Sequence, residues 1–234
     1  MFLTDPDDAA LRLLYAVPAS TGSAHRPFVR ANAITTVDGR VSGHDGTSSS
    51  INNAADKRVF DVLRSLADTV VVGAGTVRAE GYPRLPAPPG GVAPDLVVVS
   101  NSGEMPASVT DSPTHDGGVP RGRAVLATHG GTPARPGIDR LVCGEDSVDP
   151  SRLLALLHGR GTRSVLCEGG PRLLTTLLQA GLVDELAVTT APRLVGAVSD
   201  RYLTTAPLDA DLDWRGGAVI DGTTFALWRL RRSG

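Results

Sequence analysis

Residues 69–78 read T-V-V-V-G-A-G-T-V-R, a short β-branched run that leads directly into a glycine-rich turn. Such a run is too short for a helix and is typical of a strand that is buried on both faces. Gly73 and Gly75 let the backbone approach a ligand closely, and the free N–H groups of a helical turn that begins near Thr76 attract an anion. The stretch therefore predicts a buried strand that ends in a phosphate-binding turn, with a purely structural turn as the alternative.

This turn is not the dinucleotide fingerprint of the doubly wound nucleotide-binding fold. That fingerprint needs a third glycine, and Arg78 stands in its place. It also needs an acid near the end of the next strand, whereas Asp95 comes at the start of the apolar run 96–99. The usual doubly wound fold is therefore disfavoured.

A second turn of the same kind lies in V-L-C-E-G-G-P, residues 165–171. A buried strand ends here in the glycine pair Gly169-Gly170, and Pro171 is placed to begin a helix. Glu168 lies at the carboxyl end of the strand, where parallel α/β sheets bind their ligands, with a solvent-facing charge as the alternative. Two such turns side by side in space would suit the two ends of one dinucleotide.

A polar residue interrupts a third apolar segment, R-A-N-A-I-T-T-V-D-G-R, residues 30–40. Asn32 shares a strand face with Ile34 and Thr36, so its amide lies among apolar neighbours. A buried amide needs hydrogen-bond partners, and these are either a ligand or a neighbouring loop. Asp38 with Gly39 predicts an ordinary turn.

Short apolar runs alternate with helical patterns along most of the chain, which predicts an α/β fold with one mostly parallel sheet and helices on both faces. Beyond Asp184 the expected strands follow one another without a helix, so we expect antiparallel strands at the C-terminal end. The predicted strands are 28–36, 69–72, 96–99, 124–127, 165–167, 185–191, 218–221 and 224–231. Helices are predicted over residues 6–15, 151–158 and 172–180, the first of them capped by Asp5. A further helix is predicted for the segment that has apolar residues at 59, 62, 63 and 66.

No repeat or linker divides the chain. We expect a helix and a lead-in loop over residues 1–27, followed by one domain over 28–234. Two stretches, 84–94 and 101–123, are rich in Gly, Pro, Ser or Asp and are expected to lack regular structure.

Composition and charge exclude several classes of protein. The 234 residues carry a formal net charge of −2, so no global positive field favours nucleic acid. No apolar run approaches the roughly 20 residues that span a bilayer, and the acidic N-terminus does not resemble a secretory signal. Cys143 and Cys167 each follow an apolar run, as core thiols do, so we expect a reducing, cytoplasmic setting.

Taken together, the three sites resemble the reductase domain of the riboflavin-biosynthesis deaminase-reductases and its stand-alone relatives, which share the dihydrofolate reductase-like fold. The matching phrases are N-A-I-T-T-V-D-G-R, L-R-S-L-A-D-T-V-V-V-G-A-G-T-V and C-E-G-G-P, followed by G-L-V-D-E-L and A-P-R-L-V-G. They occur in the family's order from about residue 28 onward. No single phrase is specific, but the combination is.

The resemblance implies that NADPH reduces the ribosylamino group of a pyrimidine 5′-phosphate to a ribitylamino group. Because a guanidinium matches phosphate oxygens in a two-pronged geometry, Arg64 is the expected phosphate clamp, with a solvated helix residue as the alternative. The resemblance further implies a homodimer. It assigns Glu168 and Asn32 to catalysis; Ser48, Arg64 and Arg84 to the substrate; and Ala33, Ser50, Gly73, Gly75, Thr76, Asn101, Gly169 and Gly170 to the cofactor.

Within these sets, Ala33 and Ser50 are expected on the nicotinamide side and Asn101 near the adenosine 2′-phosphate. Glu168 is expected to hydrogen-bond the amino-pyrimidine edge or to assist proton transfer. No metal is expected.

The chain also departs from the family pattern. It has neither the H-x-E nor the P-C-x-x-C of the zinc deaminase domain, so deamination is excluded. Many relatives have lysine at the position of Asn32 and a large aromatic at that of Ser50, and Glu80 replaces an aspartate. Two alternatives therefore stay open: a reductase of the same fold that acts on a pterin or dihydrofolate, and a non-catalytic NADPH-binding protein.

Overall fold

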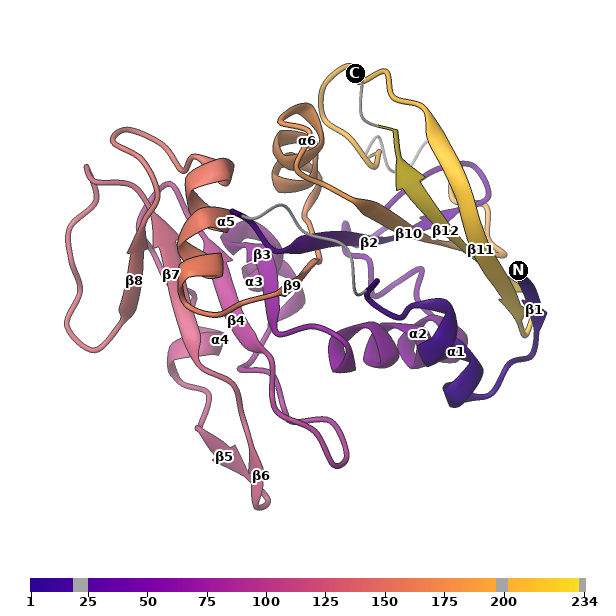
Figure 1. Ribbon diagram of the computed structural model, residues 1–234, viewed down its shortest axis with the longest axis horizontal. Helices are drawn as coiled ribbons and strands as arrows, with labels where there is room; N and C mark the ends of the chain where they lie inside the picture. The colour runs from indigo at the N-terminus through magenta and orange to yellow at the C-terminus, as the bar shows by residue number, and fades with distance from the viewer. Residues whose placement is uncertain (19–24, 197–201, 232–234) are drawn as a thin grey trace.

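A ten-stranded sheet forms the centre of the computed structural model, which describes residues 1–18, 25–196 and 202–231 (Figure 1). Its strand order is β1-β11-β12-β10-β2-β9-β3-β4-β7-β8. All neighbours are parallel except β10–β12 and β11–β12, which confirms a mostly parallel sheet with antiparallel C-terminal strands. The strands are β1 (Phe2–Thr4), β2 (Phe28–Thr36), β3 (Thr69–Gly73), β4 (Asp95–Val99), β7 (Ala124–Thr128), β8 (Asp139–Val142), β9 (Ser164–Cys167), β10 (Glu185–Ala191), β11 (Leu212–Ile220) and β12 (Thr223–Leu230).

Helices cover both faces of the sheet, as expected (Figure 1). The alternation of strand side chains produces this arrangement, because Val70 and Val72 of β3 enter one core cluster while Val71 enters the other. The first cluster lies under α1 (Asp8–Leu14), α2 (Ala54–Ser65), α3 (Ala74–Glu80) and α4 (Ala107–Thr110), and the second lies under α5 (Pro150–Gly159) and α6 (Pro171–Gln179).

The first helix begins later than expected. Its cap is Asp7, whose carboxylate accepts a hydrogen bond from the Ala10 N–H at 2.8 Å, so Asp5 is not the cap. Residues 2–4 instead form β1, which pairs in parallel with β11. This short strand has no local signal, because its partner lies at the other end of the chain. Residues 19–24 of the expected lead-in loop lie outside the described residues.

The two segments expected to lack regular structure pack on each other. Residues 101–123 contain α4 and a small hairpin, β5 (His115–Asp116) and β6 (Val119–Pro120). The Ala87 N–H donates to the Pro120 carbonyl at 2.9 Å, and Pro86 forms an isolated bridge with Arg121. The expectation was therefore wrong for part of residues 101–123, whereas residues 84–94 contain no helix or strand. Strand β11 also begins six residues earlier than expected, with a bulge between Trp214 and Gly216.

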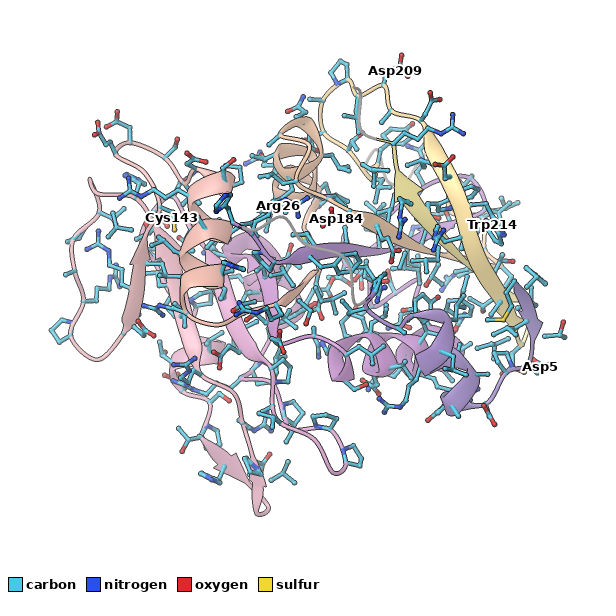
Figure 2. All side chains as sticks on the ribbon, in the orientation of Figure 1. Asp5, Arg26, Cys143, Asp184, Asp209 and Trp214 are labelled. Atoms are coloured by element: carbon cyan, nitrogen blue, oxygen red, sulfur yellow. The ribbon has the colours of Figure 1, made fainter. Side chains whose placement is uncertain are left out.

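The two cysteines are fully buried and free, which confirms their assignment to the core. Cys143 is labelled in Figure 2. Burial raises the pKa of the Cys143 thiol to about 11 and that of Cys167 to about 12, so neither is a reactive thiolate near neutral pH. Over the described ranges, no helix is long and apolar enough to cross a membrane. The same ranges contain no cluster of three or more side chains that could hold a metal ion.

Candidate active site

The two glycine-rich turns lie side by side, as the sequence predicts. Their strands β3 and β9 are parallel neighbours, so their carboxyl ends reach the same edge of the sheet. The Gly73 N–H donates to the Gly169 carbonyl at 2.8 Å, which joins the two turns directly. A Cβ atom on Gly170 would lie 2.5 Å from the Thr76 hydroxyl oxygen, so only glycine fits this close approach.

Helices α3 and α6 begin at these turns, and neither has a side-chain cap. Gly73 and Gly170 are their N-cap residues, and Pro171 stands in the first turn of α6. Helices α1, α2 and α5 are each capped by a side chain, such as that of Asn53 for α2, whereas the short helix α4 also lacks a side-chain cap. The first N–H groups of α6 are therefore left for a ligand, and the helix dipole favours a negatively charged one.

Two adjoining cavities meet at the turns. The smaller one measures about 380 Å³ and the larger about 1060 Å³, and both are of a size that holds small molecules. We call them the small cavity and the large cavity. Both are lined by Gly75, Thr76, Ala79, Gly170 and Pro171.

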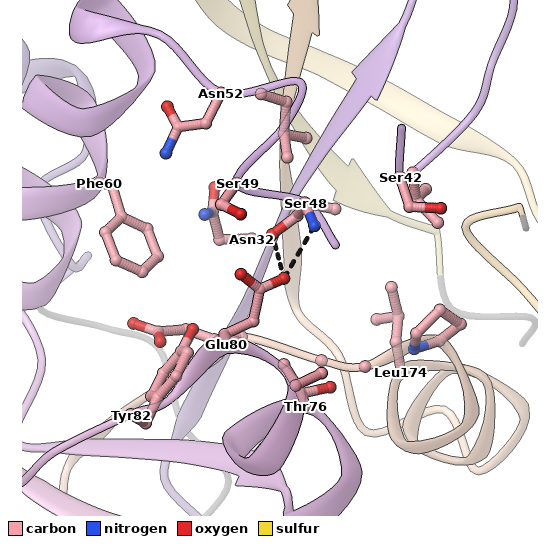
Figure 3. Close-up of a pocket in the computed structure, with 18 of the residues that line it drawn as sticks. Asn32, Ser42, Ser48, Ser49, Asn52, Phe60, Thr76, Glu80, Tyr82 and Leu174 are labelled. Carbon is pink, nitrogen blue, oxygen red and sulfur yellow. Dashed lines mark hydrogen bonds between the residues drawn. The ribbon is translucent and has the colours of Figure 1, made fainter. Parts of the chain in front are cut away.

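The residues expected around substrate and cofactor separate between these cavities. Asn32, Ser48, Arg64 and Glu168 all line the small cavity, together with Ala33 and Gly169. Figure 3 shows Asn32 and Ser48 in this cavity. The large cavity is lined by Gly73 and Asn101, with Gly75, Thr76 and Gly170 at the boundary. The fold therefore brings together residues that are far apart in the sequence, but Ala33 and Gly169, which were expected at the cofactor, line the small cavity and not the large one.

Glu168 and Arg64 form a two-pronged ion pair in the small cavity. The Arg64 Nε and Nη2 atoms donate to the two carboxylate oxygens at 2.7 and 2.8 Å. The Glu168 side chain is 1% exposed and that of Arg64 is 22% exposed. Sequence reasoning treated them as separate ligand contacts, but the structure makes them partners, because α2 lies over the end of β9.

Aromatic rings enclose this ion pair. The Arg64 guanidinium lies 4.1 Å from the ring centre of Phe60 and 5.3 Å from that of Tyr82. Burial lowers the pKa of Arg64, but the bond and charge of Glu168 outweigh burial and raise it. Burial, followed by the charge of Glu168, raises the pKa of the Tyr82 hydroxyl well above its ordinary value. Arg64 therefore stays charged and Tyr82 stays protonated in this site.

Comparison with known proteins gives the family. The model of the RibD C-terminal domain matches residues 27–216, which is most of the chain. The protein belongs to this family. Over 190 residues it is 35% identical to the 2,5-diamino-6-ribosylamino-4(3H)-pyrimidinone 5′-phosphate reductase of Methanothermobacter thermautotrophicus, covering 76% of this chain and 83% of the relative. The Archaeoglobus fulgidus protein of the same name is 29% identical over 188 residues, covering 73% and 83%.

Solved structures agree on the fold. A pyrimidine reductase-like protein of Corynebacterium diphtheriae superposes with a TM-score of 0.78 at 23% identity, covering 95% of this chain and 99% of that one. The riboflavin biosynthesis reductase of Saccharomyces gives 0.72 at 19%, covering 96% and 100%. Dihydrofolate reductase of Enterococcus faecalis gives 0.50 at 10%, covering 88% and 97%. The fold is dihydrofolate reductase-like, as the sequence predicts.

Two residues that the resemblance to the RibD C-terminal domain family placed at the site line neither cavity. The Ser50 hydroxyl accepts from the Gly43 N–H at 3.2 Å and donates to the Thr47 carbonyl at 3.0 Å, so it closes its own loop. The backbone of Arg84 is hydrogen-bonded to the 101–123 segment. Its N–H donates to the Ser112 hydroxyl, and its carbonyl accepts from the Arg121 guanidinium. The structure therefore does not bring Ser50 to the nicotinamide side or Arg84 to the substrate side.

The turn at Asp38 connects two distant loops of the RibD C-terminal domain. Its carboxylate accepts hydrogen bonds from the Thr36 hydroxyl at 2.6 Å and the Gly196 N–H at 2.8 Å. These bonds lower the pKa of Asp38 to about 2, the Thr36 bond being the larger cause. Asp38 is thus a turn residue, as predicted, and it also anchors the loop that follows β10.

Among the small-cavity residues that sequence reasoning missed, four are aromatic or acidic, and no local pattern marks them. Phe60 and Tyr82 read as ordinary apolar residues of a helix and a proline-rich loop. Asp56 reads as a solvated residue in the first turn of a helix. Glu80 was noted only as a departure from the family pattern, yet its carboxylate accepts from both the N–H and the hydroxyl of Ser48, at 2.8 and 2.9 Å (Figure 3).

Glu80→Ala is expected to loosen the loop 43–50 over the small cavity, because one Glu80 oxygen holds both Ser48 bonds. Hydrogen bonds to a charged group contribute about 1.5–3 kcal/mol each, and loss of one such contribution to substrate binding raises substrate KM at least about tenfold, while cofactor Kd stays unchanged. Steady-state kinetics and cofactor titration measure the two effects. Glu104→Ala, at an exposed carboxylate outside both cavities, is the control. A KM unchanged by Glu80→Ala would show that the loop is held by other contacts.

Proposed function

We propose that the protein is an NADPH-dependent oxidoreductase of riboflavin biosynthesis that reduces a ribosylamino-pyrimidine 5′-phosphate to its ribitylamino product. The observation that carries this proposal is the pair of adjoining cavities, which meet at two joined glycine turns. A dinucleotide in the large cavity would extend across the turns to a substrate in the small one. The relatives named as pyrimidinone 5′-phosphate reductases support the same substrate class.

The large cavity suits a dinucleotide phosphate in three ways. Its described lining contains Arg78 and Arg172 and no carboxylate. A Cβ on Gly75 would meet nothing within 4 Å, so the backbone is open to the cavity at this point. The uncapped start of α6 adds N–H groups. These residues would hold NADPH, with Asn101 toward the adenosine end, where its side-chain oxygen already accepts from the Val148 N–H at 3.0 Å.

The small cavity supplies position and electrostatics. When bound, NADPH supplies the two reducing electrons as a hydride, and the chain holds the acceptor carbon against it. Asn32, Ser48 and Thr76 line the cavity with neutral hydrogen-bonding groups. Glu168, held by Arg64, would accept hydrogen bonds from the amino groups of the pyrimidine, and the free Nη1 atom of Arg64 would contact the phosphate.

One observation favours a second candidate substrate. The small cavity is lined by three carboxylates, Asp56, Glu80 and Glu168, and by a single arginine that already pairs with Glu168. Acceptors of this kind suit amino-substituted heterocycles, whereas a phosphate gains less from them. A pterin or dihydrofolate without a phosphate is therefore the second candidate.

We also infer a cytoplasmic homodimer. The family resemblance supports the homodimer. The two free, buried cysteines support the cytoplasmic setting. A monomer mass from sedimentation equilibrium at micromolar concentration would contradict the dimer.

The reaction is tested by mixing the purified protein with NADPH and the ribosylamino-pyrimidine phosphate, in its deaminated and undeaminated forms, and following the nicotinamide absorbance. We expect NADPH to be oxidised only when the pyrimidine is present. When NADH is used in place of NADPH, we expect little oxidation. Dihydrofolate is run in parallel. Oxidation with dihydrofolate alone would replace the first candidate by the second. Tight NADPH binding without turnover of any substrate would instead indicate a non-catalytic binding protein.

A further inference from the structure

Asp56 is a buried carboxylate of the small cavity that the proposed function does not use. It lies in the first turn of α2, where the Asn53 side chain accepts its backbone N–H at 3.0 Å. The residue is 6% exposed, and it lines the same cavity as Asn32 and Glu168. Asp56 and Glu168 therefore both line the cavity of about 380 Å³ in which the substrate is proposed to bind.

No ion pair compensates Asp56 among the described residues, although several cations lie nearby. On its own helix, Lys57 pairs with Asp61, Arg58 with Asp8 and Arg64 with Glu168. From β2, Arg30 binds Glu185 at 2.7 Å and the Tyr15 carbonyl at 2.7 Å. These four cations are thus paired with groups other than Asp56.

Two other groups interact with Asp56, Tyr15 directly after α1 and Thr189 of β10. Burial raises the pKa of Asp56, and the Thr189 side-chain bond only partly opposes this. Burial also raises the pKa of Tyr15, with Arg30 opposing it and Asp56 adding to it, so Tyr15 stays neutral. A buried, uncompensated carboxylate weakens folding when it is charged, and its presence in a cavity indicates a role in chemistry.

The small cavity therefore holds two carboxylates in opposite settings. Glu168 is compensated by a two-pronged guanidinium, whereas Asp56 has only a hydroxyl partner. Pairs of acids whose surroundings differ in this way divide the roles of charged binder and proton donor. Glu168 suits the first role and Asp56 the second.

We propose that the Asp56 carboxyl group donates the proton that opens the sugar ring of the substrate. In the balanced step, carbon 1′ gains a hydride from the nicotinamide and its bond to the ring oxygen O4′ breaks. The O4′ atom takes the Asp56 proton and becomes a hydroxyl, and solvent then returns a proton to Asp56. This role rests on the proposed function, since it needs a ribosylamino substrate.

Asp56→Asn tests the role, with Asp61→Asn as a matched control on the exposed face of the same helix. General acid catalysis contributes typically about 10²–10⁴-fold, so kcat should fall at least 100-fold in Asp56→Asn. In Asp56→Asn, substrate KM and cofactor Kd should stay within about threefold of the wild-type values. The fall in kcat that the wild type is expected to show at high pH should be absent from this variant. Asp56→Glu should recover part of the rate. Asp61→Asn should match the wild type throughout.

Unfolding supplies a readout that does not depend on turnover. A raised folded-state pKa means that protonated Asp56 favours folding at low pH, and that this stabilisation is lost as the pH rises through the raised value. Asp56→Asn should therefore gain stability relative to the wild type as the pH increases. A purely structural carboxylate would give the opposite result, a loss of stability in Asp56→Asn at neutral pH.

Each outcome decides the matter. If the wild type and Asp61→Asn turn over the pyrimidine and Asp56→Asn keeps kcat within about threefold, the role of Asp56 is overturned and the proposed function stands. A loss of stability in Asp56→Asn at neutral pH also overturns the role. If the wild type oxidises no NADPH with the pyrimidine, the proposed function fails and the role of Asp56 fails with it.

Discussion

Arg64→Ala is expected to lower the free energy of unfolding by about 3 kcal/mol, because it leaves the Glu168 carboxylate buried without its partner. Breaking a buried ion pair from one side typically costs about 3–5 kcal/mol, and the partial exposure of Arg64 places the value at the lower end. Substrate KM should rise at the same time, since the Arg64 Nη1 atom, the proposed phosphate contact, is then lost. Urea unfolding and steady-state kinetics measure the two effects.

The control is Arg58→Ala, on the same helix, whose partner Asp8 is exposed. Exposed pairs contribute at most about 1 kcal/mol, so this variant should be nearly neutral. Glu168→Gln completes a double-mutant cycle with Arg64→Ala, in which the two losses should not add. In Glu168→Gln, kcat should fall far more than cofactor affinity. Additive losses of stability would show that Arg64 and Glu168 do not stabilise the fold as one ion pair. Equal losses of kcat and cofactor affinity in Glu168→Gln would show that Glu168 does not act mainly on the substrate.

Gly170→Ala is expected to weaken cofactor binding about 100-fold, which corresponds to about 2.7 kcal/mol. The added Cβ would lie 2.5 Å from the Thr76 hydroxyl oxygen, so the two joined turns must separate. Both turns contribute to the large cavity, and their separation removes the surface proposed to hold the phosphates. Overpacking of this kind also lowers stability by about 1–3 kcal/mol. Cofactor titration and thermal unfolding measure the two losses.

Two further variants separate overpacking from other causes. Adding Thr76→Ala removes the hydroxyl that collides, so the turns can rejoin and the double variant should regain both stability and part of the lost cofactor affinity. Gly159→Ala in α5 is the control, because a Cβ there meets nothing within 4 Å. Its helical position predicts a small gain in stability. Unchanged cofactor affinity in Gly170→Ala would place the phosphates elsewhere.

Most of the candidate site could be predicted from local patterns combined with a resemblance. The glycine turns, Asn32, Ser48, Arg64 and Glu168 were identified in this way, and all of them line the two cavities. The approach failed at Ser50, whose hydroxyl is used by its own loop. It also failed at Arg84, because a proline-rich loop gives no periodicity that indicates the direction of a side chain.

The amino-acid sequence by itself determined the buried strands, the turns that end them and the covering of both sheet faces. These features depend on near neighbours, through the alternation of side chains along a strand and the backbone freedom of glycine. Only the tertiary structure decided which charges meet: Arg64 and Glu168 are 104 residues apart, and Ser48 and Glu80 are 32 apart. It also left Asp56 buried without a cation. Such contacts depend on how helices lie across a sheet, because a local pattern carries no information about a partner far along the chain.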